Sequence, residues 1–154
     1  MSSRSDFTYF HTVRVRWSEV DPQGIVFNPN YFVYVDLALT EYFRMLGYGG
    51  SAFEQDGIEF FTVNANCDYR SPARFDEEIE IGFRAARFGN SSMTYAFAMF
   101  RGDTLLTEGS MTYVCADMAT RRPAPVPAHF IARIAEFEKT TPETAAGKGK
   151  ANVA

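Results

Sequence analysis

The most constraining feature of this 154-residue sequence is a long, mostly apolar segment, 30–47, with no proline and no glycine before its last position. Asn28 followed by Pro29 precedes it, which is typical of a helix N-cap with proline at the first helical position. Asp36, Thr40 and Arg44 form one polar stripe along such a helix. A helix that is apolar on its other three sides is a buried helix, so we expect the rest of the chain to wrap around it.

Four later segments alternate apolar and polar residues with the period of two that indicates a half-buried strand. They are 63–70, 78–85, 93–100 and 105–116. Turn-forming residues separate them at Ser71-Pro72, Phe88-Gly89-Asn90 and Arg101-Gly102-Asp103. Short connections of this kind join antiparallel neighbours, so the pattern predicts that the four strands follow one another as a meander.

The segment from Phe7 to Trp17 alternates in part and predicts a first strand that ends near Trp17. It leads into Asp21-Pro22-Gln23-Gly24, in which Asp, Pro and Gly stand at the first, second and fourth positions of a type I turn. We therefore expect the chain to bend sharply between this strand and the long helix.

The C-terminal part predicts an extended connector through Pro123, Pro125 and Pro127, followed by a short amphipathic helix at 130–137. From Thr141 onward aromatic residues are lacking, and we expect a single domain at 1–140 and a flexible tail at 141–154. The order of elements predicts an α+β fold, in which an antiparallel sheet of about five strands wraps around one long central helix. Its open edges and apolar helix make a homodimer the minimum expectation.

Composition excludes several classes of protein. Fifteen Phe, eight Tyr and one Trp supply ample apolar surface for a folded core. No stretch approaches the roughly 18 consecutive apolar residues of a membrane span, and the N-terminus lacks the apolar region of a signal peptide, so a cytoplasmic location is expected. The net charge is −4, and Arg121-Arg122 is the only dense positive spot, which argues against nucleic-acid binding.

Residues that carry metal or cofactor chemistry are scarce. The chain has two histidines, His11 and His129, and two cysteines, Cys67 and Cys115, without the spacing of a zinc or redox pair. Neither histidine has a plausible nucleophile beside it in the sequence, so a Ser-His-Asp or Cys-His site is poorly supported. We expect no metal and no cofactor, and core packing as the role of the cysteines.

Asp21 stands out because it lies a few residues before the start of the buried helix. Two interpretations remain open. An Asp at the first position of this turn caps its own backbone, and turn geometry alone then explains it. Alternatively, Asp21 shares a pocket with unpaired N–H groups near Asn28 and Asn30, which stabilise an oxyanion while the carboxylate attacks a carbonyl or deprotonates water. The second interpretation describes a minimal acyl-transfer site.

The stretch 15–31, with its Asp-Pro-x-Gly-Ile-Val-Phe-x-Pro-Asn-Tyr core, resembles the hot-dog-fold acyl-CoA thioesterases of the 4-hydroxybenzoyl-CoA thioesterase class. The resemblance continues in 69–77 and in the proline-bearing exit after the last strand, and it covers about Phe7 to Pro127. It implies a sheet wrapped around one long helix. It also implies a dimer or a dimer of dimers, with each active site between subunits.

The resemblance further implies roles for individual residues. Asp21 matches the aspartate that acts as nucleophile or general base on the thioester, and the backbone N–H near Asn28 polarises the thioester carbonyl. Gly24, Asn30 and Tyr31 are the further candidates for oxyanion or substrate contacts, with packing as the alternative for Tyr31. Many relatives carry Tyr or His at the position of Asn28, and this departure leaves the acyl group open.

The phosphates of CoA need cations at the protein surface. Arg87, Arg121 and Arg122 are candidates by charge and by resemblance, together with Ser91 in the turn that follows Arg87. A solvated surface arginine is the alternative for each of the three.

These observations predict the hydrolysis of an acyl-CoA thioester to a free acid and CoA. The acyl group is aromatic and hydroxybenzoyl-like, or a short to medium aliphatic chain. Acyl carrier protein is an alternative to CoA, because the same pantetheine arm enters. A hot-dog hydratase or dehydratase is disfavoured, because those enzymes use an Asp-His pair. The alternative from another class is a non-catalytic hot-dog module that binds acyl-CoA or only dimerises.

Overall fold

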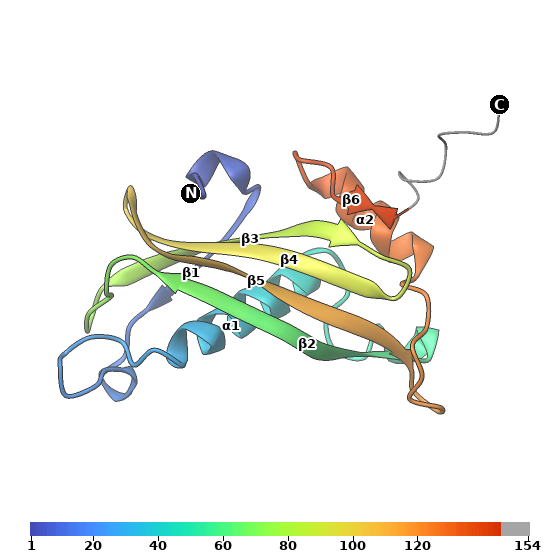
Figure 1. Cartoon of the computed structure of the whole chain (residues 1–154), viewed down its shortest axis with the longest axis horizontal. Helices are drawn as coiled ribbons and strands as arrows, with labels where there is room; N and C mark the ends of the chain where they lie inside the picture. Colours follow the sequence, from blue (N-terminus) through green and yellow to red (C-terminus); the bar gives the residue numbers. More distant parts are fainter. Residues whose placement is uncertain (146–154) are drawn as a thin grey trace.

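The structure is a computed structural model that describes residues 1–145. Over this range the chain forms one six-stranded sheet, two α-helices and three short 3₁₀ helices. The strands are β1 (Tyr9–Arg14), β2 (Ile58–Tyr69), β3 (Glu78–Phe88), β4 (Ser92–Arg101), β5 (Thr104–Asp117) and β6 (Glu143–Thr144). The helices are α1 (Asn30–Met45) and α2 (Ala128–Phe137), and the 3₁₀ helices are η1 (Arg4–Asp6), η2 (Trp17–Glu19) and η3 (Glu54–Asp56). The predicted α+β class is confirmed, with α1 lying across one face of the sheet (Figure 1).

The strands lie in the order β1-β3-β4-β5-β2, and β6 adds to β3. Tight turns join β3 to β4 and β4 to β5, as predicted. The predicted pairing of β2 with β3 is wrong, because β2 pairs with β5 and β3 pairs with β1. The reason is that α1 carries the chain across the sheet, so that β2 enters at the edge opposite β1 and the connection 70–77 returns to the β1 side.

The core lies between the sheet and α1. Alternate side chains of β3 and β4 point inward as predicted and are at most 1% exposed; they are Ile79, Ile81, Phe83, Ala85, Met93, Tyr95, Phe97 and Met99. Tyr42 of α1 meets this layer, with its ring edge-to-face at 5.4 Å from Phe83 and 5.5 Å from Tyr9. Because burial of each large apolar side chain contributes about 1.5–3 kcal/mol, this layer is the main source of stability.

The start of α1 differs from the prediction by one residue. Its N-cap is Pro29, not Asn28, and no side chain caps the helix. The reason is that Pro29 already has helical φ and ψ of −63° and −24°, while Asn28 uses its main-chain carbonyl to accept the N–H of Tyr31 at 3.3 Å. At the other end, α1 ends at Met45, and Gly47, with a φ of +91°, follows the C-cap Leu46.

A single chain does not cover α1 on three sides. Val33 and Leu37 of α1 are 48% and 42% exposed, and Phe61 and Val63 of the edge strand β2 are 39% and 58% exposed. The sheet covers one face of α1, and α2 covers only its C-terminal end. We call these four exposed side chains the uncovered apolar residues; of them, Phe61 has the guanidinium of Arg121 over its ring at 5.5 Å.

The first strand ends earlier than predicted, and a short strand follows α2. β1 ends at Arg14 rather than near Trp17, because the chain turns into η2, where Trp17 is largely exposed. β6 pairs in parallel with the end of β3, which β1 leaves open because β1 reaches only to Phe83. β6 therefore lies within the predicted tail of 141–154, whose last part, 146–154, lies outside the described residues. No helix within residues 1–145 is long and apolar enough to cross a membrane.

Candidate active site

Segment 20–26 forms a small hairpin directly before α1. The N–H of Asp21 donates to the carbonyl of Ile25 and the N–H of Gly24 donates to the carbonyl of Asp21, each at 2.9 Å. Gly24 has a φ of +74°, which residues with a side chain rarely adopt. Val20 and Val26 pair as an antiparallel bridge at the base. The turn expected from the sequence is present, and Asp21 is its first residue.

The Asp21 carboxylate has one occupied and one free oxygen. Oδ1 accepts the N–H of Gln23 at 2.8 Å, and within residues 1–145 no donor is bonded to Oδ2. Asp21 lines an open cavity of about 520 Å³ together with Trp17, Val20, Pro22, Gly24 and Phe75. The rings of Trp17 and Phe75 meet edge-to-face at 5.0 Å and form its aromatic wall. A free carboxylate oxygen in such a cavity can act as nucleophile or general base toward a bound carbonyl compound.

Among the described residues, one main-chain N–H at the start of α1 has no acceptor. The N–H of Asn30 donates to the carbonyl of Phe27 at 2.8 Å, so the expectation of a free donor there is not met. The side-chain amide of Asn30 also donates, at 2.9 Å, to the main-chain carbonyl of Glu19. Asn28 differs, because its N–H has no acceptor in the described part of the chain. Asn28 is therefore the position at which the helix start can still donate to a ligand.

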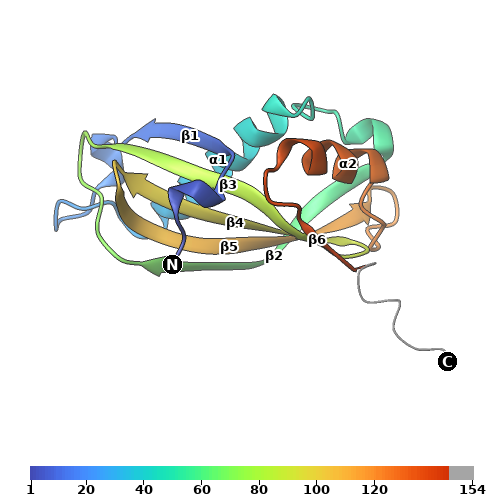
Figure 2. The same ribbon diagram turned by 90° about the horizontal axis from the view of Figure 1, so that it is seen from above.

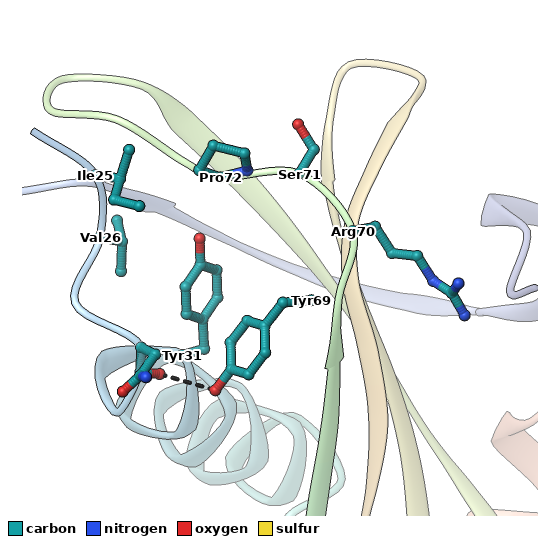
Figure 3. A pocket seen from close by; sticks show the side chains of 8 residues that line it. Ile25, Val26, Tyr31, Tyr69, Arg70, Ser71 and Pro72 are labelled. Carbon is teal, nitrogen blue, oxygen red and sulfur yellow. Dashed lines mark hydrogen bonds between the residues drawn. The ribbon is translucent and has the colours of Figure 1, made fainter. Parts of the chain in front are cut away.

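A second cavity, of about 330 Å³, opens beside the start of α1 (Figure 3). It is lined by Ile25, Val26, Asn28, Tyr31, Tyr69, Arg70, Ser71 and Pro72. The hydroxyl of Tyr69 donates to the carbonyl of Asn28 at 3.1 Å, the dashed line of Figure 3, and burial raises the pKa of Tyr69 to about 12. Tyr31 packs edge-to-face on Tyr69 at 5.3 Å, and its hydroxyl accepts the N–H of Ala73 at 3.0 Å. Tyr31 thus has both a packing contact and a tethered hydroxyl.

The two cavities are neighbours that share the hairpin. Asp21 and Gly24 line the first cavity, whereas Asn28 and Tyr31 line the second. Asn30 lines neither and acts as a structural link to Glu19. The carboxylate of Asp21 therefore lies in the hairpin, and the free N–H of Asn28 lies just after it, at the start of α1.

Sequence reasoning missed Glu19, the residue that ends η2. Its side chain is buried, and Oε2 accepts the hydroxyl of Tyr34 at 2.7 Å. Arg16 donates to the same carboxylate from its main-chain N–H and its guanidinium, each at 2.8 Å. The only signal in the sequence was the hydroxyl of Tyr34, which needs a hydrogen-bond partner once the ring is buried.

The residues predicted to bind CoA lie far from Asp21 within one chain. Arg121 pairs with Glu59 at 2.9 Å near the start of β2, whereas Tyr69, beside the candidate site, ends that strand. β2 has 12 residues, so its two ends lie roughly 35 Å apart. Arg122 follows Arg121. The loop before α1 and the loop after β5 lie at opposite ends of the molecule in both views (Figure 1, Figure 2).

The other CoA candidates lie at that same far end. Arg87 is exposed near the end of β3, and Ser91 precedes β4, where its carbonyl accepts the N–H of Cys115 at 2.7 Å. Within one chain, therefore, none of the four CoA candidates lines the Asp21 cavity.

Within residues 1–145, neither histidine forms a hydrogen bond to the hairpin at 20–26. His129, on α2, bonds to the hydroxyl of Tyr48 at 2.6 Å and to the carboxylate of Asp56 at 3.0 Å. His11 lies in β1, opposite Ile81 of β3. Across the described range, no three His, Cys, Asp or Glu side chains are grouped as metal ligands.

Comparisons with known proteins give the family and the fold of this chain. Residues 15–134 match the sequence profile of the family described as "Thioesterase-like superfamily". The acyl-CoA thioester hydrolase YbgC of Escherichia coli is 26% identical over 121 residues, which cover 78% of this chain and 90% of that protein. A protein of solved structure from Pseudomonas aeruginosa strain PAO1 is 28% identical with a TM-score of 0.76, over 90% of this chain and 97% of that one. A 1,4-dihydroxy-2-naphthoyl-CoA thioesterase from Synechocystis shares the fold with a TM-score of 0.75 at 16% identity, over 82% of this chain and 94% of that one.

An antiparallel sheet packed on one long helix is the hot-dog fold that this chain shares with thioesterases of solved structure. The profile match extends over most of the domain. The chain belongs to the thioesterase-like superfamily.

Proposed function

We propose that this protein hydrolyses acyl-CoA thioesters to a free acid and CoA, with Asp21 as the catalytic carboxylate. The observation that carries the proposal is the free Oδ2 of Asp21 in an open cavity, one turn before the unpaired N–H of Asn28. The names of relatives such as the acyl-CoA thioester hydrolase YbgC support the same reaction. The non-catalytic module remains the alternative, and it assigns Asp21 to the turn alone.

Two chemical routes use the same residues. As a nucleophile, the carboxylate attacks the thioester carbonyl carbon, CoA leaves as the thiolate, and water hydrolyses the resulting mixed anhydride. As a general base, the carboxylate removes a proton from water, whose oxygen attacks the carbonyl carbon directly; the C–S bond then breaks, and CoA leaves as the thiolate and takes up the proton. In both routes the carbonyl oxygen gains negative charge, which the N–H of Asn28 stabilises at the positive end of the α1 dipole.

The working form is a homodimer or a dimer of dimers. The uncovered apolar residues and the open edge of β2 support this assembly, because an exposed apolar edge strand seeks a partner. Antiparallel pairing of two β2 edges brings the start of one β2 beside the end of the other. The CoA-binding role of Arg87, Ser91, Arg121 and Arg122 then requires those residues of a second copy, since one chain holds them far from Asp21.

The acyl group is either aromatic or a short to medium aliphatic chain, carried by CoA or by acyl carrier protein. A thiol-release assay of the purified protein against both acyl types on both carriers tests the proposal. Release from at least one substrate is the expected result, and the ratio of kcat/KM values ranks the acyl groups. Tight acyl-CoA binding without thiol release from any substrate would contradict hydrolysis and favour the binding module.

A further inference from the structure

We propose that Glu19 is a positioning residue that holds Asp21 against the start of α1, so that loss of Glu19 lowers the catalytic rate through Asp21. This inference rests on the proposed function, which gives Asp21 its catalytic role. Glu19 touches neither cavity, so its effect on the reaction is indirect.

The carboxylate of Glu19 is buried, and both of its oxygens accept hydrogen bonds. It is 7% exposed, and a buried carboxylate is costly unless each oxygen is bonded. Oε1 accepts a hydrogen bond from the guanidinium of Arg16, and Oε2 accepts hydrogen bonds from the main-chain N–H of Arg16 and the hydroxyl of Tyr34. Burial raises the pKa of Glu19, but these hydrogen bonds outweigh burial and leave the pKa below its ordinary value. The charged form is therefore the one that the fold accommodates.

The main chain of Glu19 makes a second set of contacts. Its carbonyl accepts the N–H of Phe27 at 2.9 Å and the side-chain amide of Asn30 at 2.9 Å. Through its side chain Glu19 is bonded to α1 at Tyr34, and through its carbonyl it is bonded to the exit of the hairpin and the first residue of α1. One residue thus joins the entry of the hairpin to two turns of the helix.

Asp21, two residues further on, has no comparable anchor. Among residues 1–145, its carboxylate is bonded only to Gln23, which lies within the same turn, and its main-chain bonds to Gly24 and Ile25 are also internal to the hairpin. The position of Asp21 relative to α1 therefore depends on what holds the hairpin as a whole. A displacement of about 1 Å at a reacting group can cost on the order of 10²-fold in rate.

The chain contains a matched control for this test. Glu138 is 6% exposed and accepts the hydroxyl of Tyr42 at 2.6 Å and the N–H of Ala85 at 3.1 Å. It therefore resembles Glu19 in burial and in its tyrosine partner, but it follows α2 at the other end of α1. Glu138→Gln reports what the loss of a buried carboxylate does to the fold without touching the hairpin.

The experiment measures kcat, KM and Tm of wild type, Glu19→Gln, Tyr34→Phe and Glu138→Gln by thiol release and thermal unfolding. We expect Glu19→Gln to lower kcat about 10- to 100-fold with little change in KM, and Tyr34→Phe to lower it less. Glu138→Gln should keep the wild-type kcat. An unchanged kcat in Glu19→Gln, or an equal loss in Glu138→Gln, would overturn the proposal. If Glu19→Gln does not fold, Tyr34→Phe decides in its place.

A double variant separates positioning from a general structural effect. If Glu19 acts through Asp21, adding Glu19→Gln to Asp21→Asn leaves the residual rate of Asp21→Asn unchanged within about twofold. A double variant whose loss of rate equals the product of the two single losses would overturn the proposal. If wild type releases no thiol, the proposed function fails, and hydrogen exchange still tests the anchor. Segment 20–28 should then exchange faster in Glu19→Gln than in wild type or Glu138→Gln, and unchanged exchange would refute it.

Discussion

The hydroxyl of Tyr69 donates a 3.1 Å hydrogen bond to the main-chain carbonyl of Asn28, which ties the last residue of the edge strand β2 to the segment that begins α1. The same carbonyl accepts the N–H of Tyr31 at 3.3 Å. Two bonds therefore hold this carbonyl. The proposed oxyanion donor is the N–H of the same residue, so its direction depends in part on a side chain from the sheet.

We expect Tyr69→Phe to lower kcat about two- to tenfold, the size expected for one lost hydrogen bond, while Tm changes little because the ring is retained. Steady-state thiol release and thermal unfolding measure both quantities. Tyr48→Phe is the control, since it removes a tyrosine hydrogen bond to His129 at the other end of α1. Equal kcat values for wild type and Tyr69→Phe would show that this bond does not position the donor.

The two buried glutamates should give opposite dependences of stability on pH. For Glu138, burial raises the pKa more than the bonds from Tyr42 and Ala85 lower it, whereas for Glu19 the bonds outweigh burial and lower the pKa. A raised pKa in the folded state adds stability below the ordinary value of about 4.3 and loses it as pH rises through the folded pKa. A lowered pKa adds stability above about 4.3 and loses it as pH falls through the folded pKa.

Urea unfolding of wild type and both Gln variants from about pH 3 to pH 8 measures these differences. Relative to wild type, Glu138→Gln should gain stability as pH rises above about 4.3. Glu19→Gln should lose stability as pH rises toward about 4.3 and then level off. If the stability differences of the two variants from wild type change with pH in the same direction, the opposite pKa directions are contradicted.

The uncovered apolar residues predict that a charge on this part of α1 breaks the assembly. Leu37→Glu should convert the dimer, or the dimer of dimers, to a smaller species, because a carboxylate would have to be desolvated at the interface. Light scattering after size exclusion measures the mass. Ala135→Glu, on the exposed side of α2, is the control and should keep the wild-type mass. A Leu37→Glu protein with unchanged mass would place the interface elsewhere.

Elements whose environment is local were predictable from the sequence. The inward faces of β3 and β4 were correct because each of these strands has a neighbour on both sides and a helix on one face, which enforces strict alternation. The turn at Asp21 was correct because Asp, Pro and Gly specify it within four residues. The start of α1 was misplaced by one residue, since Pro29 is compatible with either position.

Features that depend on distant parts of the chain were not predictable. The pairing of β2 with β5 follows from where α1 delivers the chain, and no local pattern records that. The burial of Glu19 depends on Tyr34, fifteen residues further on. The separation of Arg121 from Asp21 follows from the same topology, so candidates chosen by charge and by resemblance lie at the far end of the molecule.

The most direct test of the account is the kcat/KM of Asp21→Asn on the best acyl-CoA substrate of the wild-type protein. Asn keeps the size of the side chain and an oxygen that can accept the N–H of Gln23, so the turn and Tm should be retained. We predict a loss on the order of 10²- to 10⁴-fold, the contribution of a catalytic acid or base. An Asp21→Asn protein that keeps full thioesterase activity would contradict the catalytic role and leave Asp21 as a residue of the turn.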